Sequence, residues 1–125
     1  MNSDEKKRIL DEHFEIIACA AGELDKIPPG WMSKFEAFFK RVNIWNRTND
    51  HWYFLQEIKI TGLLVQVKFN IHPVNGAIRC IVLRLKSDCV HSCQICGDHS
   101  EMKAPLAGYS YCKPCYELFT LINEI

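Results

Sequence analysis

The feature that most constrains the fold is a pair of cysteine motifs near the C-terminus. Cys93 and Cys96 form one C-x2-C pair, and Cys112 and Cys115 form a second pair after a spacer of 15 residues. Two thiolates separated by two residues in a tight turn can share one tetrahedral ion, with each sulfur about 2.3 Å from zinc. The spacing is typical of four-cysteine zinc sites. The sequence therefore predicts a Zn²⁺ ion bound by these four cysteines.

Other uses of paired cysteines fit this pattern less well. A redox dithiol needs one pair in a thioredoxin-like context. A rubredoxin-like iron site usually carries a glycine after both pairs, whereas Tyr116 follows the second pair here. Four thiolates leave no open coordination position, so the predicted site is structural. Cys89, His91 and His99 flank the first pair and remain alternative ligands.

The residues around the cysteines predict a small zinc module. Gly97 allows a turn beneath the sulfurs, residues 109–111 alternate as in a short hairpin, and Pro114 suits the first position of a helix. A cysteine turn, a hairpin and a second cysteine turn at a helix start form the treble-clef arrangement. We therefore expect an α+β domain over residues 1–88 and a zinc-binding treble clef over residues 89–125, packed on it.

Hydrophobic periodicity predicts helices in the N-terminal part of the chain. Apolar residues at helical spacing indicate one helix from about Ser3 to Leu24, which Pro28-Pro29-Gly30 would end. A second helix should begin near Trp31. Its predicted core stripe consists of Trp31, Phe35, Phe38, Phe39 and Val42. The polar residues 43–50 are predicted to form a loop.

The middle of the chain predicts a β-hairpin. Residues 51–60 are rich in aromatic and β-branched side chains, and residues 63–71 alternate between apolar and polar, the period of a half-buried strand. Thr61-Gly62 should provide the turn of an antiparallel hairpin. Residues 77–87 fit a helix or a strand, and the helix is favoured. The expected fold class is α+β, with N-terminal helices packed on the hairpin.

Charge is balanced overall but unevenly distributed. The chain has 15 basic and 15 acidic residues, yet residues 31–86 carry nine basic and three acidic ones. A basic middle is compatible with an acidic partner and equally with an ordinary surface. A signal peptide and a membrane span are not expected, which predicts a cytoplasmic protein with reduced thiols. Cys19 and Cys80 are predicted to be small core residues.

Four features occur in order along the chain: Gly30-Trp31 at a helix start, a hairpin over residues 55–69 that turns at Gly62, the motif at Cys93–Gly97, and the motif at Cys112–Cys115. In this order they resemble a family of small uncharacterised proteins of bacteria and phages with a C-terminal four-cysteine treble-clef or zinc-ribbon module. The hairpin lacks the charged Lys-Glu-Lys-Phe-Gly-Gly run of that family. The resemblance implies a helix over residues 77–92. It gives no activity to carry over, because the family has no assigned chemistry. Small proteins of this sort often serve in toxin immunity or phage–host conflict.

The predicted function is a protein-interaction module, such as an immunity or inhibitor protein with one protein partner. A closed zinc site, neutral charge and the lack of a catalytic constellation favour this hypothesis. The binding face would be the basic hairpin or exposed aromatic residues among Trp45, Trp52, Tyr53 and Phe54. A homodimer through the strand edges is a further option.

Nucleic-acid binding is the alternative function. It rests on basic residues that lie beside aromatic ones, namely Arg41, Arg47, Lys59, Lys68, Arg79, Arg84 and Lys86. The isoelectric point near 6.9 is far below the value above 9 that is typical of such domains. Asp98-His99 resembles the Asp-His pair of His-Asn-His nucleases, but Asn is missing between His99 and Cys112. We therefore expect a protein that is not an enzyme.

Overall fold

The computed structural model describes residues 3–50, 52–71, 73–97, 102–104, 109–111 and 114–115. The elements, in chain order, are α1 (Ser3–Glu12), α2 (Phe14–Ile17), the 3-10 helices η1 (Ala18–Lys26) and η2 (Pro29–Trp31), α3 (Met32–Asn49), β1 (Leu55–Thr61), β2 (Leu64–Phe69), α4 (Gly76–Val90), β3 (Met102–Ala104) and β4 (Tyr109–Tyr111). The α+β class expected from the sequence is confirmed.

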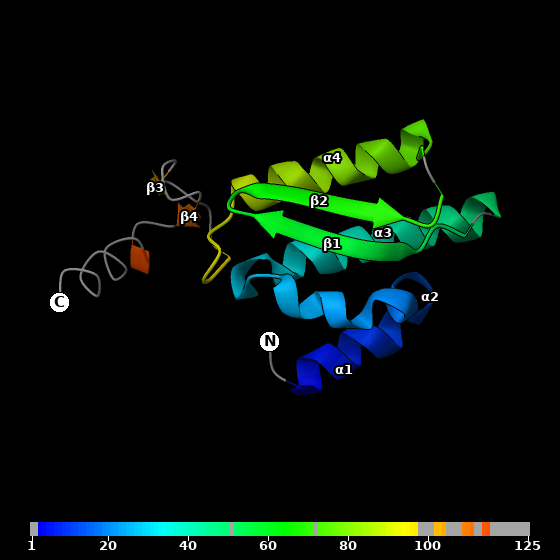
Figure 1. Cartoon of the computed structure of the whole chain (residues 1–125), viewed down its shortest axis with the longest axis horizontal. Coiled ribbons are helices and arrows are strands. Elements are labelled where there is room, and N and C mark those ends of the chain that lie inside the picture. Colours follow the sequence, from blue (N-terminus) through cyan, green and yellow to red (C-terminus); the bar gives the residue numbers. More distant parts are fainter. Residues whose placement is uncertain are drawn as a thin grey trace.

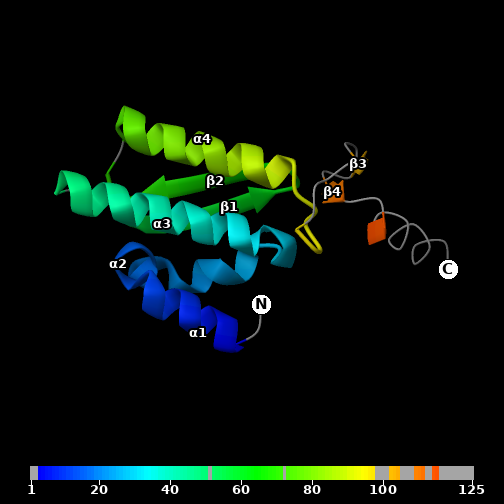
Figure 2. The same cartoon turned by 180° about the vertical axis from the view of Figure 1, so that it is seen from behind.

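The core lies between α3 and the β1–β2 hairpin. The predicted stripe is confirmed, because all five of its side chains are fully buried. Phe38 packs against Phe69 of β2 with ring centroids 6.1 Å apart, and Tyr53 meets Phe69 edge-on at 5.8 Å. In both views α3 lies between α4 and the N-terminal helices (Figures 1 and 2). The aromatic face of α3 therefore joins the helices to the sheet.

The hairpin is antiparallel, as predicted, and turns one residue later than expected. Thr61 pairs with Leu64, so Gly62 and Leu63 form the turn. Gly62 has φ 61°, a backbone angle that favours glycine. The first strand begins at Leu55 instead of residue 51. Trp52, just before the strand, is 52% exposed.

The prediction of a loop over residues 43–50 is wrong, because α3 continues to Asn49. The buried side chain of Asn46 accepts a hydrogen bond from the backbone N–H of Tyr53 and donates one to its carbonyl, both at 3.0 Å. The side chain of Asn46 thus connects the last turn of α3 to the segment that follows the helix. The helix ends at Asp50, which adopts a left-handed conformation with φ 52°.

The single N-terminal helix predicted from Ser3 to Leu24 is also wrong. The chain forms α1, the single turn α2 and the 3-10 helix η1. The tighter 3-10 winding brings Glu23 and Lys26 to the backbone of Ile58 on β1. Contacts with the sheet therefore override the helical periodicity of the sequence.

The helix favoured for residues 77–87 is confirmed as α4. The Asn75 side chain caps it by accepting a hydrogen bond from the N–H of Ile78 at 2.9 Å. Ile78, Leu85 and Cys89 face the core, whereas Cys80 is exposed. The prediction that Cys80 is a core residue is wrong, because the spacing of the buried positions turns it to the solvent side. The side chain of Cys19 lies outside the described residues.

The hairpin predicted between the cysteine motifs is confirmed as β3 paired antiparallel with β4, in which Lys103 faces Ser110. The predicted C-terminal helix falls mostly on residues 116–125, which lie outside the described residues. Within the described part of the chain, every helix is too short or too polar to cross a membrane.

Candidate metal centre

Three of the four predicted ligands lie together. The sulfur atoms of Cys93, Cys96 and Cys115 are all within 4.8 Å of one another. Tetrahedral coordination with Zn–S bonds of about 2.3 Å requires sulfurs about 3.8 Å apart, so this spacing fits one shared ion. Cys112 lies outside the described residues. The structure thus brings together a cysteine group that can hold a metal ion.

The turn over residues 92–97, which we call the knuckle, is shaped around the sulfur of Cys93. The backbone N–H of Ile95 donates to this sulfur at 3.4 Å, and the N–H of Gly97 donates to the Cys93 carbonyl at 2.9 Å. Gly97 has φ 85°, a left-handed angle that strains other residues. A donor aimed at sulfur favours the thiolate, which is the form that binds metals. The residues therefore fit a metal ion.

The knuckle packs directly, backbone against backbone, on the helices and hairpin of residues 3–90, which we call the body. The N–H of Gly30 donates to the carbonyl of Gln94 at 2.8 Å. A Cβ on Gly30 would lie 2.0 Å from the carbonyl oxygen of Cys93, and a Cβ on Gly97 would lie 2.8 Å from the carbonyl oxygen of Gly30. Only glycine at both positions permits this approach. The sequence indicated Gly30 only as part of a helix stop. Its contact with Cys93, 63 residues later, could not be predicted from neighbouring residues.

Two side chains extend this contact. The buried indole N–H of Trp31 donates to the carbonyl of Ser92 at 3.0 Å, one residue before Cys93. On the other side, the Gln94 amide donates to the carbonyl of Gly62 in the hairpin turn at 3.3 Å. In Figure 1 the yellow segment after α4 passes beside this turn. The knuckle is therefore fixed to both the start of α3 and the hairpin.

The alternative ligands do not join the cysteine group in the described residues. Cys89 is fully buried, and burial raises the pKa of its thiol to about 12, which keeps it protonated. His91 is exposed and lies outside the group. His99 falls outside the described residues. Among the described residues, the cysteines that lie close enough to share a metal ion are thus the first pair and Cys115.

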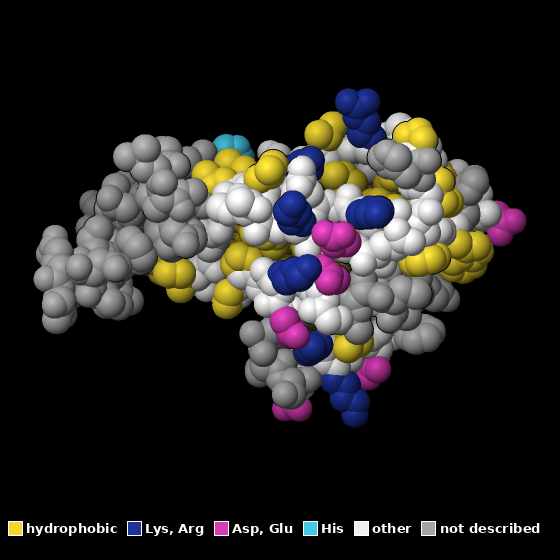
Figure 3. Space-filling view, in the orientation of Figure 1, with side chains coloured by type: hydrophobic (Ala, Val, Ile, Leu, Met, Phe, Trp, Pro, Cys, Tyr) yellow, Lys and Arg dark blue, Asp and Glu magenta, His cyan; other side chains and the backbone are white. Residues whose placement is uncertain are grey.

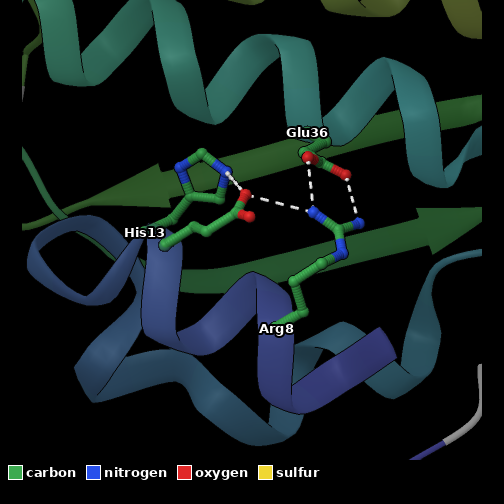
Figure 4. A network of polar contacts seen from close by, with 4 residues as sticks. Arg8, His13 and Glu36 are labelled. Carbon is green, nitrogen blue, oxygen red and sulfur yellow. Dashed lines mark hydrogen bonds and ion pairs between the residues drawn. The ribbon is translucent and has the colours of Figure 1, made fainter. Parts of the chain in front are cut away.

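A second group of potential ligands was not predicted. Ligand atoms of Glu12, His13 and Glu36 lie within 4.8 Å of one another (Figure 4). The Arg8 guanidinium donates to Glu36 at 2.8 and 3.0 Å and to Glu12 at 3.1 Å. Arg8 and Glu12 are four residues apart on α1, and this spacing in the sequence could have indicated their pairing. Glu36 comes from α3, 28 residues from Arg8, and only the fold brings it there.

The charges of this second group are already balanced within the chain. The Arg8 hydrogen bond holds the pKa of Glu36 below its ordinary value. His13 is 3% exposed, and its burial lowers the pKa of the imidazole, so the ring is neutral at pH 7. Its Nε2 lies 3.9 Å from a Glu12 oxygen. Arg8 therefore already places a positive charge against both carboxylates.

No family model matches this chain, and no curated protein or solved structure matches it.

Proposed function

We propose that this chain is a zinc-stabilised protein-interaction module of the immunity or inhibitor type, acting on a specific partner protein in the cytoplasm. In this proposal Cys112 completes a four-thiolate set with Cys93, Cys96 and Cys115, and the C-terminal segment is a treble clef. A closed set of thiolates is typical of structural zinc. The knuckle contacts at Gly30 support a role for the metal in holding the C-terminal segment on the body.

Bound zinc would supply no reacting position, because four sulfurs fill its coordination shell. The residues of the chain would do the rest. Cys93 is anchored by the Ile95 N–H, and Gly97 lets the chain turn back towards Gly30. A metal bound by Cys93, Cys96 and Cys115 would then cross-link the knuckle to the chain around Cys115. Recognition is left to the surface of the α+β body.

The observation that carries the protein-binding proposal is the exposed apolar surface on the helices. Ile44 of α3 is 65% exposed, and Leu83 of α4, which lines the separate groove between α4 and β2, is 53% exposed. Between the two helices lies a hollow of about 340 Å³, lined by Arg41, Ile44, Trp45, Thr48, Asn49 and Ile81. A large apolar side chain such as Ile44, facing solvent beside an arginine and a tryptophan, is typical of protein interfaces.

Two measurements test this proposal. Elemental mass spectrometry of the purified full chain should find one zinc per chain, and loss of zinc should follow Cys96→Ser. The immobilised metal-loaded chain should then retain one protein from its own cell, with free chain competing for it. Ile44→Glu should weaken this retention, whereas Lys7→Glu on the N-terminal helix should not. Retention of no protein at physiological ionic strength would contradict the proposal.

Nucleic-acid binding is the second candidate, favoured by the three cations that surround the groove between β2 and α4, namely Lys68, Arg79 and Lys86. Binding through phosphates weakens steeply as salt rises, because counterions are released. Retention of an oligonucleotide with a steep salt dependence would support this candidate. A partner held through apolar contacts would show a shallow one.

A further inference from the structure

The two edges of the β1–β2 hairpin differ. On the outer edge of β1, the N–H of Ile58 donates to the Glu23 carboxylate at 3.0 Å, and its carbonyl accepts from the Lys26 ammonium at 3.3 Å. These backbone groups therefore point away from β2. Side chains of η1 thus occupy the outward backbone groups of Ile58, and they cover this edge of β1 where another strand would pair with it.

The opposite edge is open in the described part of the chain. Ile58 faces Val67 across the antiparallel ladder. Because the Ile58 backbone groups point outward, this is a non-hydrogen-bonded pair, and the N–H and carbonyl of Val67 point outward from β2. The sheet has the order β1–β2, without a further strand beside β2 among the described residues. The N–H donor and the carbonyl acceptor of Val67 are therefore directed to the outer side of β2, where another strand could pair with them.

The open edge borders a groove. A hollow of about 460 Å³ lies between β2 and α4, and its lining residues are Val67, Lys68, Phe69, Val74, Arg79, Val82, Leu83 and Lys86. The lining is apolar apart from three cations, and among the described residues it includes no carboxylate. In Figure 3, Lys and Arg side chains are spread over the hairpin and α4 beside exposed apolar side chains. The groove thus joins a free strand edge, an apolar floor and positive charge.

We infer that this groove binds an extended acidic segment of a partner protein, which adds a third strand to the hairpin beside β2. The inference rests on the proposed function and names the chemistry of the partner. The segment's backbone would pair with the outward groups of Val67. Because successive side chains of a strand alternate, one row would face α4 and lie on Val82 and Leu83, whereas carboxylates of the other row would lie beside Lys68. Arg79 and Lys86 lie one helical turn to either side of the apolar pair and add positive charge at both ends of the groove.

Charge favours this occupant over a second copy of the chain. Two copies joined edge to edge would place the same patch against itself, since such an interface is isologous. Lys68, Arg79 and Lys86 of one copy would then face the cations of the other. An acidic segment instead pairs each cation with a carboxylate and uses the backbone edge as well.

The test is calorimetric titration of the metal-loaded full chain with a peptide of alternating valine and glutamate. Arg79→Glu and Lys86→Glu should each weaken binding by about tenfold or more, because each replaces an attraction with a repulsion. Lys59→Glu is the matched control, since Lys59 is exposed on β1 and lies outside the groove. It should leave the affinity unchanged. A valine–lysine peptide should not bind.

Val67→Pro tests the added strand itself. Proline removes an N–H that points away from β1, so the ladder keeps its hydrogen bonds while the edge loses its donor. We expect loss of peptide binding with an unchanged circular dichroism spectrum. If this variant unfolds, the two charge reversals still decide the matter. Equal peptide affinity in both of them and in the wild type would overturn the inference.

Other occupants give different results. A dimer in light scattering that Val67→Pro dissociates would identify a second copy. A single-stranded oligonucleotide that displaces the peptide and binds more tightly would identify nucleic acid. Either result overturns the inference. If a captured partner binds the Arg79→Glu variant as well as the wild type, the groove fails and the proposed function stands. If no partner is captured, the proposed function fails by itself.

Discussion

The two groups of potential metal ligands differ in where their counter-charge comes from. The cysteine group brings together three sulfurs, and a cysteine that binds a metal does so as a negative thiolate. The group of Glu12, His13 and Glu36 is equally close, but Arg8 from the same chain lies against both carboxylates. Proximity of ligand atoms is therefore not enough to define a metal site. The two groups differ because the fold places a cation of its own, Arg8, against the carboxylates of the second group.

Removal of the metal should have the largest effect. Cys93→Ala, or a strong chelator, should unfold the chain after residue 92, because binding of structural zinc contributes about 10–16 kcal/mol in small zinc domains. Limited proteolysis and hydrogen exchange would detect this loss. Cys80→Ala, at an exposed cysteine away from the group, is the control and should keep its metal. If the segment after residue 92 stayed fully protected from proteolysis and exchange without metal, the prediction would be wrong. The cysteine group would then need a metal no more than the group of Glu12, His13 and Glu36 does.

Gly30→Ala should break the contact between the knuckle and the body. The new Cβ would lie 2.0 Å from the Cys93 carbonyl oxygen, and backbone on both sides has to move. We expect a loss of about 3 kcal/mol in the free energy of unfolding, together with weaker metal binding. Gly76→Ala is the matched control, since nothing lies within 4 Å of its added Cβ. Denaturant titration of both variants, with metal affinity measured alongside, would check this.

Arg8→Met should sharpen the comparison, because it removes the internal cation of the second group. The pKa of Glu36 should rise towards its ordinary value once the Arg8 hydrogen bond is lost. The variant should also take up a second equivalent of Zn²⁺, whereas the wild type should take up only one. NMR titration and metal analysis would measure the two effects. Lys6→Met, which breaks an ion pair with Asp25 and leaves the group intact, should change neither.

The smallest effect should come from His13. Burial lowers the pKa of its imidazole, whereas the unfolded chain takes up the proton near pH 6.5. Below that pH the unfolded state binds more protons than the folded state, so the free energy of unfolding should fall as pH drops from about 7 to about 5. His13→Leu should flatten this part of the stability profile. His91→Gln, at an exposed histidine, should retain it.

Local patterns predicted much of the fold. The aromatic stripe of α3, the period-two strand β2 and the helix favoured for residues 77–87 each follow from neighbouring residues. The loop predicted for residues 43–50 failed because the amide of Asn46 finds its partners on Tyr53, beyond the end of the helix. Polar composition alone does not reveal that a buried polar group is satisfied.

The sites divide in the same way. The cysteine spacing predicted the group that includes Cys93 and Cys96, because two pairs with this spacing have few other uses. The approach of Gly30 to Cys93 and the meeting of Arg8 with Glu36 join residues far apart in the chain. No sequence period records such contacts. The open edge of β2 likewise follows from the contacts of the Ile58 backbone with Glu23 and Lys26, which are also far apart in the chain.

The hydrogen bond from Trp31 to Ser92 gives the protein a built-in optical probe. This indole is fully buried, and its N–H donates to the carbonyl of Ser92, the residue before Cys93. Indole emission shifts in wavelength when its surroundings or its hydrogen bond change. Displacement of the knuckle should therefore be visible in the intrinsic emission of Trp31, without any label, once Trp45 and Trp52 are replaced by phenylalanine.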